Sequence, residues 1–287
     1  MQYLNVYFMN VYAKNKLSGK TVAGIFNREE FGDVDMQKLS ENLNQSTVAF
    51  VNKLDVDKFE ARFYCGNKEE KFCGYATIGT FYTLAEKNYI IPIEEGVKNV
   101  SLKTERGKIE VELHYKDFEI DHVSLKFPKI EVNSEIPQDE FLKVLNISRE
   151  DLRSDNIYTT ENRDSQHKQV VIPLKKAEFV QNPKLITEEA EEYFQKMGYD
   201  SIEFLALRGE NDVFRKWIYP TSQSDKIDNS EDVTDLSFYY LFNEGLVNED
   251  KEFHLNGDYV FSLKKPEDGI VRLEARASIY LDGVLNI

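Results

Sequence analysis

Positive charge is scarce in this chain, and the deficit excludes several classes of function. The 287 residues include 36 lysines and arginines against 51 aspartates and glutamates, which gives a formal net charge of −15. Nucleic acids and anionic membranes are bound by clustered Lys and Arg side chains that neutralise phosphates. We therefore expect no nucleic-acid and no membrane partner. An anionic small molecule would need a locally positive binding site, such as the backbone amides at a helix N-terminus.

Cysteine and histidine are also scarce, with two cysteines and four histidines in the chain. An unsecreted chain of this length does not depend on a disulfide. Neither residue type shows the spacing of a structural zinc site. The sequence therefore predicts no disulfide and no metal. The residues concerned are Cys65, Cys73, His114, His122, His167 and His254.

Long apolar runs and a basic leader are missing as well. Residues 1–5 have neither a basic nor an apolar segment typical of a signal peptide. No stretch approaches the roughly 18 apolar residues of a membrane helix. Hydrophobic residues make up 41% of the chain, enough for one large core or two medium ones. We expect a folded cytoplasmic protein of one or two domains.

The first half of the sequence combines strand patterns with two helix patterns. Met36, Leu39 and Leu43 share one face of a helix that Asp35 can cap. Residues 73–85 are mostly apolar and indicate a buried helix. A turn at residues 105–107 indicates a hairpin. Runs rich in β-branched and aromatic residues predict strands at 3–11, 21–26, 47–51, 59–64, 100–102 and 108–115.

The second half repeats this order. Amphipathic helices are expected at residues 137–144 and 187–197, and an apolar helix at 233–246 ends at Gly245. Each half contains a strand, a loop and then a buried helix, which predicts two similar lobes. The first amides of each central helix would form a natural anion site. Strands are expected at 170–173, 177–180, 202–207, 213–219, 259–263, 271–275 and 278–281.

Four short motifs, none of them specific alone, occur in order along almost the whole chain. They are Ser18-Gly19-Lys20-Thr21, Asn44-Gln45-Ser46-Thr47-Val48-Ala49-Phe50-Val51, Cys73-Gly74-Tyr75-Ala76-Thr77 and Glu231-Asp232-Val233-Thr234-Asp235-Leu236-Ser237. In this order they resemble the Gly-Asn-Pro turn and the Asn-x-Ser-Glu-Thr-x-Phe-Val, Cys-Gly-His-Ala-Thr and Glu-Asp-Pro-Val-Thr-Gly-Ser-Ala motifs of the phenazine-biosynthesis PhzF-like family, whose members are relatives of diaminopimelate epimerase. Lys265-Pro266 resembles a later Arg-Pro of the family.

The resemblance implies an α+β fold of two similar lobes. Each lobe would be a β-barrel-like sheet around a central helix, as in diaminopimelate epimerase. The N-terminal lobe would comprise residues 1–127 and 276–287, and the C-terminal lobe residues 128–275, with the site between them. The resemblance also implies acid/base chemistry without a cofactor, and it allows a homodimer because relatives are often dimers.

Two residues depart from the pattern of active family members. Thr47 stands in place of the Glu that moves the proton, and Tyr75 stands in place of the His of the next motif. A threonine hydroxyl does not titrate near neutral pH. A phenol, with a pKa of about 10, donates a hydrogen bond but does not readily take a proton.

The second-half motif is altered too. Asp232 and Thr234 are retained, whereas Asp235-Leu236 replaces Gly-Ser, which leaves the register of Ser237 open by one position. Asp232 can be an acid facing the other lobe or an N-cap that holds the first amides of its helix. Asp235 suits the helix dipole but repels a carboxylate ligand.

Cys73 is likewise open to two interpretations. It stands where diaminopimelate epimerase, as the resemblance implies, has one of two proton-transferring cysteines. Helix N-terminal amides lower the pKa of a thiol. No cysteine lies near Asp232, so a two-thiol mechanism is not available. The alternative is that Cys73 is a small buried residue.

Two functions follow. The first is a cofactor-independent isomerase or epimerase that transfers a proton on a small anionic, carboxylate-bearing metabolite. The alternative, favoured by the missing Glu, is a catalytically inactive family member that binds a small molecule or regulates. The catalytic candidates are Asp232, Cys73, Tyr75 and Thr47. The substrate-binding candidates are Ser46, Gly74, Ala76, Thr234, Asp235 and Ser237.

Overall fold

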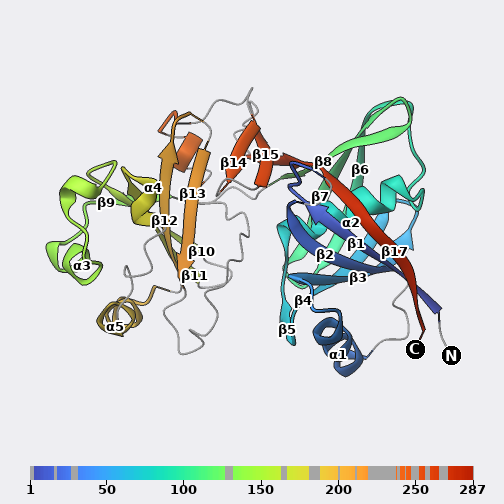
Figure 1. Ribbon diagram of the computed structural model, residues 1–287, viewed down its shortest axis with the longest axis horizontal. Helices are drawn as coiled ribbons and strands as arrows, with labels where there is room; N and C mark the ends of the chain where they lie inside the picture. The colour runs from blue at the N-terminus through green and yellow to red at the C-terminus, as the bar shows by residue number, and fades with distance from the viewer. Residues whose placement is uncertain are drawn as a thin grey trace. The chain divides into compact units, whose positions relative to one another are not determined.

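The computed structural model forms two compact units (Figure 1). Unit 1 comprises residues 1–127, 258–264 and 272–287, and unit 2 comprises residues 128–257 and 265–271. None of the described helices is long and apolar enough to cross a membrane. The structure describes residues 3–15, 18–26, 32–126, 132–162, 167–180, 188–199, 201–210, 212–218, 237, 240–242, 244–246, 252–255, 259–264 and 271–286.

Strands dominate unit 1. Its described helices are α1 (Asp33–Leu43) and α2 (Gly74–Glu86). Its strands are β1 (Tyr3–Val11), β2 (Lys20–Phe26), β3 (Thr47–Asp55), β4 (Lys58–Cys65), β5 (Lys68–Glu70), β6 (Glu95–Thr104), β7 (Gly107–Lys116), β8 (Glu119–Lys126), β15 (Tyr259–Lys264), β16 (Arg272–Ala275) and β17 (Ala277–Asn286).

The strands of unit 1 form one continuous paired series. The order is β17-β1-β2-β3-β4-β6-β7-β8-β16-β15, with β5 added beside β4. The pairs β2–β3 and β4–β6 are parallel and the others are antiparallel. Only Arg276 separates β16 from β17 in the sequence, and Ala13, just after β1, bridges to Tyr259 of β15, so the two ends of the series lie close together. The sheet therefore curls into a barrel-like shape.

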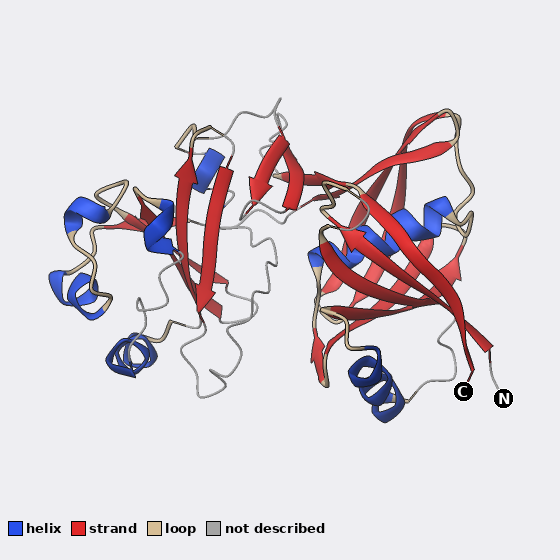
Figure 2. Ribbon diagram, viewed as in Figure 1, coloured by secondary structure: helices blue, strands red, loops and turns tan. Residues whose placement is uncertain are grey.

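Helix α2 runs through the middle of this curled sheet, as Figure 2 shows. It contacts β1, β2, β3, β7, β8 and β17, and eleven of its thirteen residues are buried. A helix that is apolar on all sides is stable only when protein surrounds it. The helix predicted from residues 73–85 is therefore confirmed, as is the hairpin at residues 105–107, where Thr104 of β6 pairs with Gly107 of β7.

Gly79 allows α2 to approach β1 closely. A Cβ atom at this position would lie 2.6 Å from Val11 Cγ2 and 2.8 Å from Met9 Sδ. Ordinary carbon–carbon contacts are about 3.5–4.0 Å. The absence of a side chain at Gly79 therefore sets the distance between the helix and the first strand.

Unit 2 is also built on a sheet, with the strand order β9-β10-β11-β12-β13-β14. The pairs β11–β12 and β13–β14 are parallel. The strands are β9 (Asn133–Glu135), β10 (Ile157–Asn162), β11 (His167–Leu174), β12 (Ser201–Arg208), β13 (Asp212–Ile218) and β14 (Glu252–Leu255). The helices are α3 (Asp139–Val144), α4 (Ala177–Val180), α5 (Glu188–Met197) and a 3₁₀ turn at Arg149–Asp151.

The two sides of β12 in unit 2 have different chemistry. Phe204 lies in an apolar core with Phe141 of α3 and Phe194 of α5, whose ring centroids are 5.6 Å apart. Alternate residues of a strand point to opposite sides. On the other side, Glu203 Oε1 lies 2.7 Å from Arg215 Nε, and both side chains are almost fully buried. Unit 2 therefore contains a buried ion pair in addition to its apolar core.

One strand prediction in this unit is wrong. Residues 177–180 were expected to be a strand, but they form the short helix α4, and Phe179 N–H donates to the carbonyl of Lys176. Four residues with two buried positions do not distinguish period 2 from period 3.6.

The helix predicted at residues 233–246 is partly described. Residues 237 and 240–242 are helical, whereas residues 233–236, 238, 239 and 243 lie outside the described residues. Gly245 has a φ of +61°, as expected at a helix end.

Candidate functional site

Three of the predicted site residues come together in unit 1. Thr47 is the first residue of β3, Cys73 is the N-cap residue of α2, and Tyr75 lies in the first turn of α2. The Thr47 hydroxyl hydrogen-bonds to the Tyr75 hydroxyl, and Thr47 Oγ1 lies 3.8 Å from Cys73 Sγ. All three residues are buried. The structure thus joins two motifs that are far apart in the sequence.

A fourth residue, Lys20, completes this group. It is the first residue of β2, which pairs in parallel with β3 through Val22 and Thr47. Lys20 is only 7% exposed, and its ammonium lies 4.1 Å from the centroid of the Tyr75 ring. A cation over an aromatic face is attracted by the ring quadrupole. We call Lys20, Thr47, Cys73 and Tyr75 the α2 cluster.

Lys20 was not among the residues predicted for the site. The sequence signal was present, because Lys20 occupies the Asn position of the Gly-Asn-Pro turn. Its burial could not be read from the sequence, since lysine is almost never fully buried unless it is paired. Gly19, with a φ of +104°, sets the start of β2 and therefore the position of Lys20.

The helix end at this cluster is electropositive. The first amides of a helix have no intrahelical acceptor, and the helix dipole places partial positive charge there. The Cys73 side chain does not cap them, and the first turn of α2 contains no acidic residue. By contrast, α1 and α3 both have two acidic residues in their first turns. The start of α2 is therefore suited to an anion.

The cluster contains one ammonium, one thiol and two hydroxyls. The thiol is the readier proton-exchanging group, because a phenol ordinarily has a pKa of about 10, and the threonine hydroxyl serves as a hydrogen-bond partner. The remaining predicted residues of unit 1 surround it. Gly74 and Ala76 are buried in the first turn, and Ser46 is exposed, with its hydroxyl 3.3 Å from that of Thr21.

Residues 9–221 match the model of the PhzC-PhzF family, described as phenazine biosynthesis-like protein, and the match includes the whole α2 cluster. The chain belongs to this family.

One curated relative and two solved structures are also similar to this chain. An uncharacterized isomerase of Clostridium acetobutylicum is 28% identical over 176 residues, which cover 60% of this chain and 56% of that relative's length. A PhzF-family phenazine biosynthesis protein from Enterococcus faecalis has a TM-score of 0.72 at 15% identity, with complete coverage of both chains. A predicted epimerase from Pseudomonas aeruginosa has a TM-score of 0.74 at 15% identity, with 99% of each chain covered. These structures establish the epimerase-like α+β fold.

The PhzC-PhzF motif in the second half is only partly described. Asp232, Thr234 and Asp235 lie outside the described residues. Ser237 is helical and fully buried. Their predicted roles stay predictions, and the α2 cluster is the part of the site on which the chemistry can be argued.

Proposed function

We propose that this chain is a cofactor-independent isomerase or epimerase that moves a proton on a small carboxylate-bearing metabolite. Membership of the PhzC-PhzF family supports the isomerase class. The single observation that carries the proposal is the α2 cluster. It places a thiol, a phenol and a buried ammonium at a helix N-terminus that has no acidic residue in its first turn.

The substrate carboxylate would be bound by Lys20 and the first amides of α2. The chain as a whole carries a net charge of −15, so an anion needs a local positive site. A buried ammonium attracts a carboxylate more strongly than a surface lysine, because water screens the charge less. Amides at a helix end add directed donors.

The reaction would transfer a proton to and from a carbon beside the carboxyl group. Removing that proton leaves an electron pair that spreads onto the substrate oxygens. Lys20 and the helix amides would stabilise this charge. Cys73 or Tyr75 would exchange the proton, and Asp232, which the sequence leaves open between an acid and an N-cap, is the candidate for a second acid/base group. Thr47 would hold the Tyr75 hydroxyl in position through their hydrogen bond.

The test is solvent deuterium exchange with the full chain. A panel of cyclic and amino-acid-like carboxylates is incubated with the protein in heavy water, and deuterium incorporation is read by mass spectrometry. The variant Lys20→Met should weaken binding and raise KM. Cys65→Ser is the matched control for Cys73→Ser, because Cys65 lies on β4, outside the α2 cluster. Exchange catalysed equally by Lys20→Met and wild type would contradict the proposed binding mode.

A catalytically inactive binding protein is the second candidate. The observation that favours it is the Thr47–Tyr75 hydrogen bond, in which a hydroxyl occupies the place of the family's proton-moving carboxylate. This candidate predicts carboxylate binding by calorimetry with no deuterium exchange for any member of the panel. The first candidate predicts exchange for at least one carboxylate that binds.

A further inference from the structure

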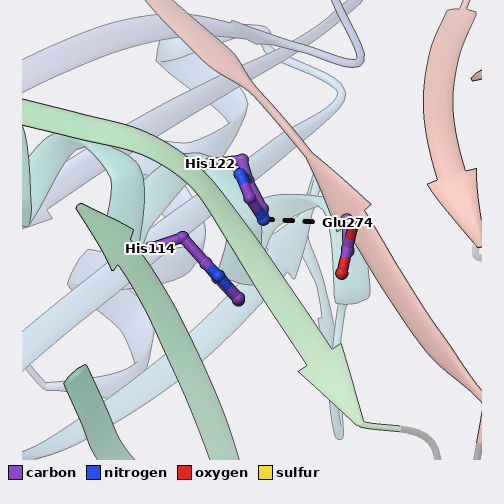
Figure 3. Close-up of side chains that lie close together, drawn as sticks. All are labelled: His114, His122 and Glu274. Carbon is purple, nitrogen blue, oxygen red and sulfur yellow. Dashed lines mark ion pairs between the residues drawn. The ribbon is translucent and has the colours of Figure 1, made fainter. Parts of the chain in front are cut away.

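Two histidines and a glutamate lie close together in unit 1, as Figure 3 shows. His114 of β7 lies directly opposite His122 of β8 in the antiparallel register. Glu274 of β16 lies opposite Ser124 of β8. Residues directly opposite each other project from the same face, as do residues two apart in one strand. Leu125 of β8 points toward α2, since its Cδ1 lies 4.0 Å from the position of a Cβ at Gly74, so the alternate residues His122 and Ser124 face away from α2.

The side-chain nitrogen and oxygen atoms of these three residues lie close together, and two of them lack a hydrogen-bond partner among the described residues. One nitrogen or oxygen from each residue lies within 4.8 Å of the others. The imidazole rings are stacked, with centroids 4.0 Å apart, and His122 Nε2 is 3.9 Å from Glu274 Oε2. Both Nε2 atoms are buried and make no hydrogen bond within the described part of the chain. Buried polar atoms without a partner are costly and need an explanation.

A β-bulge orients one of the two rings. Tyr115 pairs with Ile120 and His114 pairs with His122, so Asp121 is an extra residue in β8. Asp121 Oδ2 lies 2.7 Å from His122 Nδ1, and Arg276 Nε donates to the Asp121 carbonyl at 3.1 Å. A carboxylate that accepts from Nδ1 leaves Nε2 as the lone-pair atom. Metal-binding histidines almost always have such a carboxylate or carbonyl partner.

From this arrangement we infer that His114, His122 and Glu274 form a binding site for a divalent transition-metal cation of the Zn²⁺ class. Two imidazoles and one carboxylate form a donor set that suits Zn²⁺, whereas Mg²⁺ and Ca²⁺ prefer oxygen ligands. Three protein ligands leave a fourth position open. A metal at about 2.0–2.2 Å from each ligand needs these atoms roughly 1 Å closer together. The two stacked rings would also have to rotate apart, because a metal lies in the plane of each imidazole that binds it and the ring planes are now only 18° from parallel.

A cation between the rings and Glu274 would link three strands that come from distant parts of the sequence, β7, β8 and β16.

Sequence spacing alone does not reveal this site. The histidines are eight residues apart on the two sides of a turn, which matches no compact zinc motif. The bulge at Asp121 and the pairing of β16 with β8 create the proximity.

The test is calorimetric titration of ZnCl₂ into the full chain after chelator treatment and dialysis. We expect one Zn²⁺ per chain, with at least tenfold weaker binding by His114→Gln, His122→Gln and Glu274→Gln. His254→Gln is the matched control, because His254 lies on β14 of unit 2, and it should bind as wild type does. Cys65→Ser/Cys73→Ser should also bind normally, which excludes thiols as the ligands.

Thermal unfolding gives a second readout that does not depend on activity. Zn²⁺ should raise the Tm of the wild type and leave the Tm of His122→Gln unchanged, because a ligand stabilises only the folded state that binds it. Should a histidine variant fail to fold, Glu274→Gln, which preserves side-chain shape, supplies the comparison. No Zn²⁺ binding by the wild type, or equal binding by all cluster variants, would overturn the inference.

Discussion

Replacing Gly79 by alanine should reveal how tightly α2 is held inside unit 1. The new Cβ would lie 2.6 Å from Val11 Cγ2 and 2.8 Å from Met9 Sδ, and both neighbours are fully buried. These atoms must move by roughly 1 Å to reach ordinary contact. Overpacking of this kind lowers the free energy of unfolding by about 1–3 kcal/mol, and the higher helix propensity of alanine offsets up to about 1 kcal/mol of this loss. We expect a net loss of about 1–2 kcal/mol in the free energy of unfolding.

The matched control for Gly79→Ala is Gly74→Ala in the same helix. A Cβ at Gly74 would have its nearest neighbour at 3.9 Å, which is an ordinary contact. This variant should be neutral or up to about 1 kcal/mol more stable. The assay is equilibrium urea unfolding followed by circular dichroism. Equal stability of the two variants, or a gain for Gly79→Ala, would refute the close approach of α2 to β1.

Three further predictions concern other parts of the chain. Arg215→Met removes an ion-pair partner of the buried Glu203 and should cost about 3–5 kcal/mol in urea unfolding, whereas adding Glu203→Leu should recover much of the loss; a double variant no better than the single one would contradict this. The hydrogen bond from Arg62 lowers the pKa of Glu69 in the folded protein. The ionised Glu69 therefore stabilises the fold at pH values above the ordinary pKa of a glutamate, and this stabilisation is lost as the pH falls through the lowered pKa. Replacing Glu69 by Gln should therefore lower stability at pH 7 by at most about 1 kcal/mol and have no effect in acid, and the opposite pH trend would contradict the assignment. Finally, the wild type should lack the isomerase activity of the phenazine pathway, because a positioned carboxylate base contributes about 10²–10⁴-fold. Thr47→Glu with Tyr75→His should restore only weak exchange into the phenazine precursor, and exchange by the wild type at about 1 per second or faster would show that another residue is the base.

The central helix of unit 1 could be predicted from the sequence because its signal is local. Residues 73–85 form an apolar run that is too long for most strands, and its burial follows directly. The 105–107 hairpin was also predictable, since Gly107 adopts a φ of +124° that few other residues tolerate. The segment at 177–180 was not, because four residues do not establish a period.

The candidate site depended on long-range pairing that the sequence does not encode locally. Thr47, Cys73 and Tyr75 could be proposed through the family resemblance, yet their mutual contacts come from the placement of β3 beside the start of α2. Lys20 was missed because its burial depends on the parallel pairing of β2 and β3. His114 and His122 were missed because a bulge and a cross-strand register bring them together.

Proton transfer by the α2 cluster on a small carboxylate is tested by the rate of solvent deuterium exchange into the carboxylate that the wild type exchanges fastest, compared among wild type, Cys73→Ser and Tyr75→Phe. At least one of the two variants should lose about 10²-fold or more in rate, as expected when a positioned acid or base is removed. Rates within about twofold of wild type for both variants would contradict it.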